Sequence, residues 1–159
     1  MPAFRRKELD ALNDKGVLLL AKGGILEPIK CFSNVLALKS DSSMPLNNLG
    51  LVYDSIWCYY TAIYFYEKCN NIDPLFAKAW YNKGRSLDEL GDYEIARQCY
   101  DKSIEIDPNN ADAWHNKGVS YHKQLRFEDA IDCYNRAIYV NPAKSLTAGN
   151  ILKALKRQL

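Results

Sequence analysis

Apolar residues along the chain recur at intervals of three and four, which is the spacing of one face of an α-helix. In one of the clearest stretches, Trp80, Leu87 and Leu90 share such a face. The spacing stops at Gly91-Asp92 and resumes afterwards at Tyr93, Ala96, Tyr100, Ile104 and Ile106. This pattern predicts two helices separated by a tight turn, with Asp92 as the N-cap of the second helix.

The same sequence of helix, break and helix is predicted four times. The breaks fall near Lys22–Gly24, Ile56–Cys58, Gly91–Asp92 and Leu125–Arg126. Three of the hairpins end at a dipeptide that contains proline, which lacks an N–H and disfavours helix in the preceding residue. These dipeptides are Asp73-Pro74, Asp107-Pro108 and Asn141-Pro142. We therefore expect four helical hairpins and no strand in these windows.

A second, longer period of 34 residues sets the frame of the hairpins. The ladder of glycines is Gly16, Gly50, Gly84 and Gly118, and a ladder of rings in the same register is Phe32, Tyr66, Tyr100 and Tyr134. A glycine within a helix costs about 0.5–1 kcal/mol relative to alanine, so its repetition needs compensation. We expect each ring to pack against the bare backbone of the glycine. The resulting repeats are 9–42, 43–76, 77–110 and 111–144, followed by an amphipathic segment at 145–159.

These repeats resemble the tetratricopeptide family, whose signature is also 34 residues long. The residues that carry the resemblance are Trp80-Tyr-Asn-Lys-Gly84 with Leu87, Tyr93, Ala96, Tyr100 and Pro108, and Trp114-His-Asn-Lys-Gly118 with Tyr121, Phe127, Ala130, Tyr134, Ala137 and Pro142. The resemblance implies an all-α, right-handed α-solenoid of antiparallel helix hairpins. The chain is then one solenoid domain over 1–159, closed by a capping helix at 145–159.

Charge and cysteine content exclude several other classes of protein. The net charge is +2 and no concentrated basic face is evident, so nucleic acid is not an expected partner. No apolar stretch approaches the roughly 20 residues that span a membrane. The five cysteines follow neither a disulfide pattern nor a zinc-ligand spacing, which favours a reducing, cytoplasmic location. We expect no metal, no cofactor and a partner that is a protein or peptide.

The resemblance also implies where a partner binds, because the first helices of such repeats line a concave groove that holds a peptide. The groove residues selected on this basis are Met44, Asn48, Leu51, Lys78, Tyr81, Asn82, Arg85, His115 and Asn116. The first repeat offers Asp10, Asn13, Asp14, Val17 and Leu20 at matching positions. Asn48, Asn82 and Asn116 resemble an asparagine ladder that grips a peptide backbone through amide groups. A carboxylate clamp, as in some family members, is incomplete: only Asn48 and Lys78 match it.

Two other classes of function remain as alternatives. No pattern of catalytic residues is present. His115 and His122 lie seven residues apart on one predicted helix, about 10 Å along its axis, which is too far for them to share a metal ion. We therefore expect no enzyme. The second repeat instead suggests a homo-oligomer. Trp57 stands where the third repeat has Gly91. Tyr60 and Tyr64 stand at positions that the third and fourth repeats fill with charged and amide residues, namely Glu94 and Gln98, and Glu128 and Asp132. An exposed aromatic patch of this kind is typical of an interface.

Overall fold

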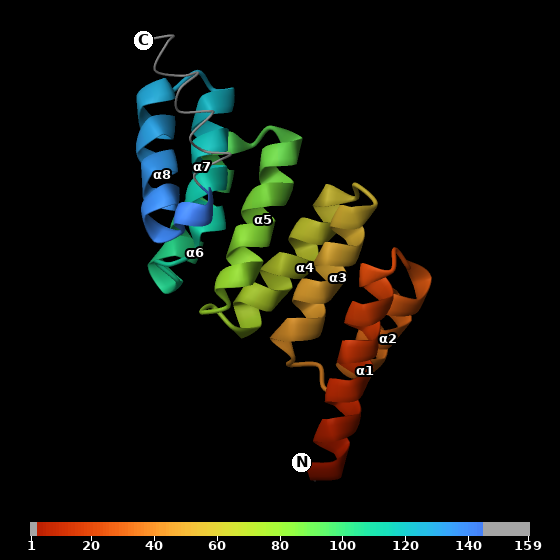
Figure 1. Ribbon diagram of the computed structural model, residues 1–159. Helices are drawn as coiled ribbons and strands as arrows, with labels where there is room; N and C mark the ends of the chain where they lie inside the picture. The colour runs from red at the N-terminus through yellow and green to blue at the C-terminus, as the bar shows by residue number, and fades with distance from the viewer. Residues whose placement is uncertain (1–2, 145–159) are drawn as a thin grey trace. The chain divides into compact units, whose positions relative to one another are not determined.

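The computed structural model describes residues 3–144, which contain eight α-helices, a short 3₁₀ turn and no strand (Figure 1). The chain divides into two compact units, Met1–Ala79 and Trp80–Leu159. Unit 1 contains α1 (Ala3–Ala21), α2 (Leu26–Leu38), α3 (Ser43–Ser55), α4 (Tyr59–Ile72) and the first residues of α5 (Ala77–Leu90). Unit 2 contains the rest of α5, α6 (Tyr93–Ile106), α7 (Ala111–Lys123), α8 (Phe127–Val140) and the turn η1 (Pro142–Lys144). The predicted capping helix at 145–159 lies outside the described residues.

All four predicted breaks are confirmed, since each lies between the two helices of a hairpin. The turns share one backbone feature that recurs every 34 residues. One residue of each turn has a positive φ: Gly23 (80°), Trp57 (60°), Gly91 (86°) and Leu125 (60°). Glycine takes this conformation without strain, whereas a residue with a Cβ is disfavoured there. Two of the turns are therefore strained, and both place a large apolar side chain in solvent.

The hairpins end as the proline-containing dipeptides predict. Asp73, Asp107 and Asn141 are the C-caps of α4, α6 and α8. In each, a side-chain oxygen accepts a hydrogen bond from the backbone N–H two residues later, at 3.1 Å. Asp92 is the N-cap residue of α6, as predicted, but its side chain makes no capping hydrogen bond.

The ring-on-glycine contact is present in all four hairpins. A Cβ built on Gly84 would lie 2.7 Å from Cε1 of Tyr100, and one on Gly16 would lie 2.6 Å from Cε1 of Phe32. Gly118 meets Tyr134 in the same way at 2.8 Å, and Gly50 meets Tyr66. The four rings are completely buried. The absence of a side chain at each glycine therefore determines how closely the two helices of a hairpin approach.

Each unit has its own apolar core around these rings. In unit 1, α3 packs between α2 and α4. Leu49 and Val52 meet Phe32 of α2, and Leu46 meets Tyr66 of α4. In unit 2, Ala130 and Tyr134 of α8 pack with residues of α7, and α7 also packs against α6. Within each unit, the first helix of the later repeat (α3 or α7) thus contacts both its own second helix and that of the repeat before it. The side of α3 or α7 that faces neither of these helices is available to contribute to a surface of its unit.

Candidate protein-interaction surfaces

The selected groove residues of unit 1 come from α3 and the start of α5. Met44 is 52% exposed, Lys78 is exposed and Leu51 is half-buried. Asn48 is only 7% exposed, and its amide lies among other amides. Its Nδ2 donates to Oδ1 of Asn13 at 3.1 Å, and its Oδ1 accepts from Nδ2 of Asn47 at 3.4 Å. Asn48 therefore joins α3 to α1.

A cavity of about 530 Å³ opens beside these residues in unit 1. The walls come from α1, from the end of α2 and from the start of α3. The lining residues are Arg6, Leu9, Asp10, Asn13, Val35, Lys39, Ser42, Met44 and Pro45. Asp10, Asn13 and Met44 were among the groove positions expected from the sequence. The structure thus brings predicted groove residues of two repeats together around one hollow.

In unit 2, the selected residues form a small aromatic and polar cluster on α5 and α7. The ring of Tyr81 lies 6.2 Å from that of Tyr100, and its hydroxyl accepts a hydrogen bond from Nδ2 of Asn116 at 3.0 Å. The guanidinium of Arg85 lies 6.0 Å from the Tyr81 ring. His115 is half-buried, with its ring 5.3 Å from that of Tyr134, and Asn82 is 7% exposed. Arg85 is the exposed member of this cluster, whereas Tyr81, His115 and Asn116 are half-buried.

The asparagine ladder has a different environment from the one expected. Asn48 and Asn116 each donate a hydrogen bond to a residue 35 positions earlier, on the first helix of the preceding repeat. These amides therefore connect neighbouring repeats, which restricts their freedom to hold a ligand. Their direct contact with a partner's backbone stays a prediction.

The aromatic patch of the second repeat is as exposed as the sequence suggested. Trp57, Tyr60 and Tyr64 are 79%, 77% and 52% exposed. The ammonium of Lys68 lies 5.0 Å from the centre of the Tyr64 ring, which is a cation–π contact. The patch occupies the strained turn and the outer side of α4.

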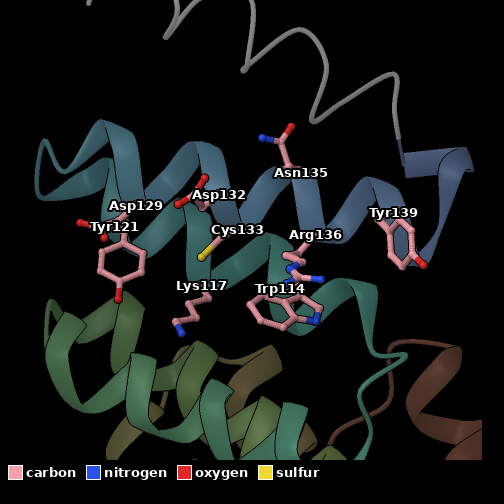
Figure 2. A pocket seen from close by; sticks show the side chains of 9 residues that line it. All are labelled: Trp114, Lys117, Tyr121, Asp129, Asp132, Cys133, Asn135, Arg136 and Tyr139. Atoms are coloured by element: carbon pink, nitrogen blue, oxygen red, sulfur yellow. The ribbon is translucent and has the colours of Figure 1, made fainter.

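A second hollow, of about 650 Å³, lies between α7 and α8 in unit 2 (Figure 2). Its α7 residues are Trp114, Lys117 and Tyr121, and its α8 residues are Asp129, Asp132, Cys133, Asn135, Arg136 and Tyr139. Lys117 also reaches back to Asp101 of α6, with Nζ and Oδ1 2.5 Å apart. We name this hollow the α7–α8 groove.

A model of the tetratricopeptide repeat matches residues 77–110 and 111–144, which are the third and fourth predicted repeats. Residues 77–144 are therefore two tetratricopeptide repeats. No curated protein matches it in sequence. Among solved structures, the chain is similar to a crystal structure of MamA, with a TM-score of 0.77 and 21% identity over 86% of this chain and 80% of that one.

Two further structures show the same fold. Residues 41 to the end of MamA from Desulfovibrio magneticus RS-1 give a TM-score of 0.82 at 18% identity, covering 94% of this chain and 84% of that one. The tetratricopeptide repeat domain of Arabidopsis OM64 gives 0.71 at 21% identity, covering 75% of this chain and 98% of that one. At these identities the likeness is one of fold. The all-α class of stacked helical hairpins is thereby established.

The third repeat differs from the other three in a buried arginine, which the sequence analysis above did not identify. Arg97 is 4% exposed and stands where the other repeats have Ile29, Ile63 and Ile131. Its guanidinium donates to Oε1 of Gln124 at 2.6 Å, pairs with Glu94 and lies 4.5 Å from the Tyr121 ring. The break in a ladder of isoleucines was the signal that could have identified it.

Other chemistry within the described part of the chain is sparse. The five cysteines, all among the described residues, form no disulfide. Burial raises the pKa of the Cys133 thiol to about 11 and that of the Cys69 thiol to about 12, so both stay protonated at neutral pH. Within residues 3–144, no three histidine, cysteine or acidic side chains gather as metal ligands would. In the same range, no helix combines the length and apolarity that a bilayer crossing requires.

Proposed function

We propose that the chain is a non-catalytic adaptor that binds a segment of a partner protein along the first helices of its repeats. The observation that supports this function is the cavity of unit 1, because predicted groove residues from α1 and α3 line it. An exposed methionine at its edge is an adaptable apolar contact for a partner. The partner is a protein or peptide, and cysteines without a disulfide favour a cytoplasmic location.

The test uses a partner that co-purifies with the full chain from its source cell. Its binding is measured by isothermal titration against the wild type, Met44→Glu and the control Leu75→Glu, since Leu75 is 75% exposed outside the cavity. We expect Met44→Glu to weaken binding at least tenfold and Leu75→Glu to leave it unchanged. Equal binding by all three proteins would contradict the proposed groove.

The asparagines could hold the ligand or link the repeats, and one variant distinguishes these roles. In it Asn48, Asn82 and Asn116 are replaced by alanine, and both its affinity and its unfolding midpoint are measured. A loss of affinity with an unchanged unfolding midpoint would support a direct grip on the ligand. A lower unfolding midpoint in urea would support the role as links between repeats, since each lost hydrogen bond costs about 0.5–1.5 kcal/mol.

A second candidate function is self-association through the aromatic patch, favoured by one specific observation. Trp57 keeps a left-handed backbone, φ 60°, with its ring 79% exposed. Strain that persists at an exposed position suggests a functional site. We expect Tyr60→Glu with Tyr64→Glu to abolish a dimer seen by light scattering. The matched control is Tyr139→Glu, because Tyr139 is 82% exposed on α8. A wild type that stays monomeric at high concentration would exclude this candidate.

A further inference from the structure

The cavity of unit 1 combines an apolar floor with a rim that carries excess positive charge. Leu9, Val35 and Pro45 form the floor and are almost completely buried. Arg6 comes from α1, Lys39 follows α2, and both are exposed at the rim. Asp10 is the acidic residue of the lining, so the charged side chains sum to one net positive charge.

We infer that this cavity recognises an apolar side chain followed by an acidic residue in the partner segment. The inference rests on the proposed function and specifies which chemistry the cavity selects. The apolar side chain lies on the floor beside Met44, and the carboxylate lies at the rim near Arg6 and Lys39. A basic residue at the same place would meet two like charges instead of two opposite ones.

A polar group inside the cavity offers a hydrogen-bond donor to the backbone of the partner segment. Asn13 is 7% exposed, and its Nδ2 donates to the sulfur of Met44 at 3.4 Å. A thioether is a weak acceptor, and an amide nitrogen carries two hydrogens. A carbonyl oxygen of a partner segment is a better acceptor for this donor than the sulfur it now meets.

The start of α3 adds a further preference for negative charge. Ser42, the N-cap residue of α3, lines the cavity, and its side chain makes no capping hydrogen bond. The first N–H groups of a helix lack partners within the helix, and that end carries partial positive charge. The first turn of α3 contains no acidic residue that would offset this charge. This wall of the cavity therefore attracts negative charge, as Arg6 and Lys39 do.

The experiment is an NMR titration of the ¹⁵N-labelled full chain with three hexapeptides blocked at both ends. In each peptide a leucine, flanked by glycine and serine, is followed by glutamate, glutamine or lysine. We expect shifts concentrated in the amides of residues 9–13 and 39–46, and an affinity about threefold higher for glutamate than for lysine, the effect of one exposed ion pair. Shifts spread over the whole chain, or equal affinities for the three peptides, would overturn the inference.

A charge reversal gives a sharper result. Lys39→Glu is expected to invert the preference, so that the lysine peptide binds more tightly. The control is Lys22→Glu, which changes the net charge equally at an exposed position outside the cavity. The same inversion in the control would assign the preference to the general field of the protein and refute the local site.

The two proposals fail in distinguishable ways. A full-length partner that binds wild type and Met44→Glu equally would refute the adaptor groove, whatever the peptides do. Peptides that bind at the cavity, lose affinity with Met44→Glu and show no charge preference would refute only the inferred selectivity.

Discussion

At the residue scale, an aromatic ring on the second helix of each hairpin occupies the space that a side chain on the glycine of the first helix would need. Tyr100 contacts the backbone of Gly84, and the nearest backbone atom to a new Cβ there is the Ala96 carbonyl oxygen at 3.0 Å. A carbonyl on a packed helix cannot move aside as the end of a flexible side chain can. The glycine ladder is therefore a packing requirement in each hairpin.

The substitution Gly84→Ala tests this requirement. Overpacking costs about 1–3 kcal/mol and the better helix propensity of alanine returns about 0.5–1, so we expect a net loss of about 1–2 kcal/mol. Urea unfolding followed by circular dichroism measures it. Arg85→Ala, at the next, exposed position, is the control and should change little. Equal stability of both variants would show that the helices separate easily.

The buried rings also differ in what their hydroxyl groups meet. Tyr66 donates to Asp54 at 2.7 Å, and Tyr100 donates to Asp88 at 2.6 Å. In the fourth repeat the equivalent residue is His122, and the Tyr134 hydroxyl has no hydrogen-bond partner within the described residues. In the first repeat the pair is replaced by Phe32 and Leu20. The hydroxyl and the carboxylate are thus retained or lost largely together.

Asp88 makes the stability of unit 2 depend on pH. Burial raises the pKa of its carboxyl above the usual range, and the hydrogen bond from the Tyr100 hydroxyl opposes that rise without cancelling it. The folded state consequently holds a proton that the unfolded state has already released near pH 4. Stability attributable to Asp88 is therefore full below the unfolded pKa and falls as pH rises through the folded pKa.

Asp88→Asn removes this titration. We expect the urea midpoint of the variant, relative to wild type, to rise between pH 4 and pH 7, because the asparagine cannot ionise and still accepts the Tyr100 hydroxyl. The midpoints are compared at four pH values in this range. A constant difference between the two proteins would show that Asp88 has an ordinary pKa.

At the element scale, Arg97 determines how α6 meets α7. Its guanidinium also lies 3.4 Å from the Ser120 hydroxyl, which itself donates to the Tyr93 carbonyl at 3.3 Å. The partner Glu94 is 70% exposed, so removing the arginine leaves no buried carboxylate behind. A buried ion pair often adds little stability over an apolar residue of the same volume.

We therefore expect the free energy of unfolding of Arg97→Met to lie within about 1 kcal/mol of the wild-type value, or above it. Arg97→Ala should lose about 2 kcal/mol or more, since it leaves a space between α6 and α7. Both are measured by urea unfolding. A loss as large in the methionine variant as in the alanine variant would show that the charge itself stabilises the junction.

The helices and their breaks follow from the sequence because the 34-residue register repeats the same local signals four times. The strained turns at Trp57 and Leu125 do not, because the sequence there lacks glycine and only the register relates them to Gly23 and Gly91. Asn48 shows a second limit. The spacing places it on the first-helix face, but a sequence cannot reveal that Asn13 and Asn47 already bond its amide.

The candidate site was predictable in part for a similar reason. Asp10, Asn13 and Met44 could be found from repeat positions, whereas Arg6 and Lys39 lie where repeat logic assigns no role. They join the cavity only because α1 begins ahead of the first repeat and because the chain passes from α2 to α3 beside it.

At the scale of the whole molecule, the 34-residue register that joins α7 to α6 continues in the sequence after the fourth hairpin. Lys117 and Tyr121 contact α6 through Asp101 and Arg97. Ile151 and Leu155 follow these two residues by 34 positions. Asn135 and Ile131 of α8 likewise follow Asp101 and Arg97 by 34 positions. We propose that residues 145–159 cover this side of α8.

A variant that ends at Lys144 tests this proposal. We expect a lower urea midpoint and stronger binding of an apolar fluorescent dye, because Ile131 and its apolar neighbours on α8 become exposed. Ile151→Asp with Leu155→Asp in the full chain should give the same result, and Lys153→Ala should not. An unchanged midpoint after truncation would place the segment elsewhere.

Repeats of constant length can be copied within a gene without shifting the register of the remaining repeats, and Arg97 limits where such a copy is tolerated. A second copy of residues 77–110 placed directly after the first would present Arg97 with Ser86 and Leu90, where it now meets Ser120 and Gln124. The serine would be kept, but the amide acceptor would be lost to an apolar side chain. A duplicate of 111–144 meets no such conflict, because Ile131 needs no polar partner. Growth of this array by internal duplication is therefore favoured at its C-terminal repeat.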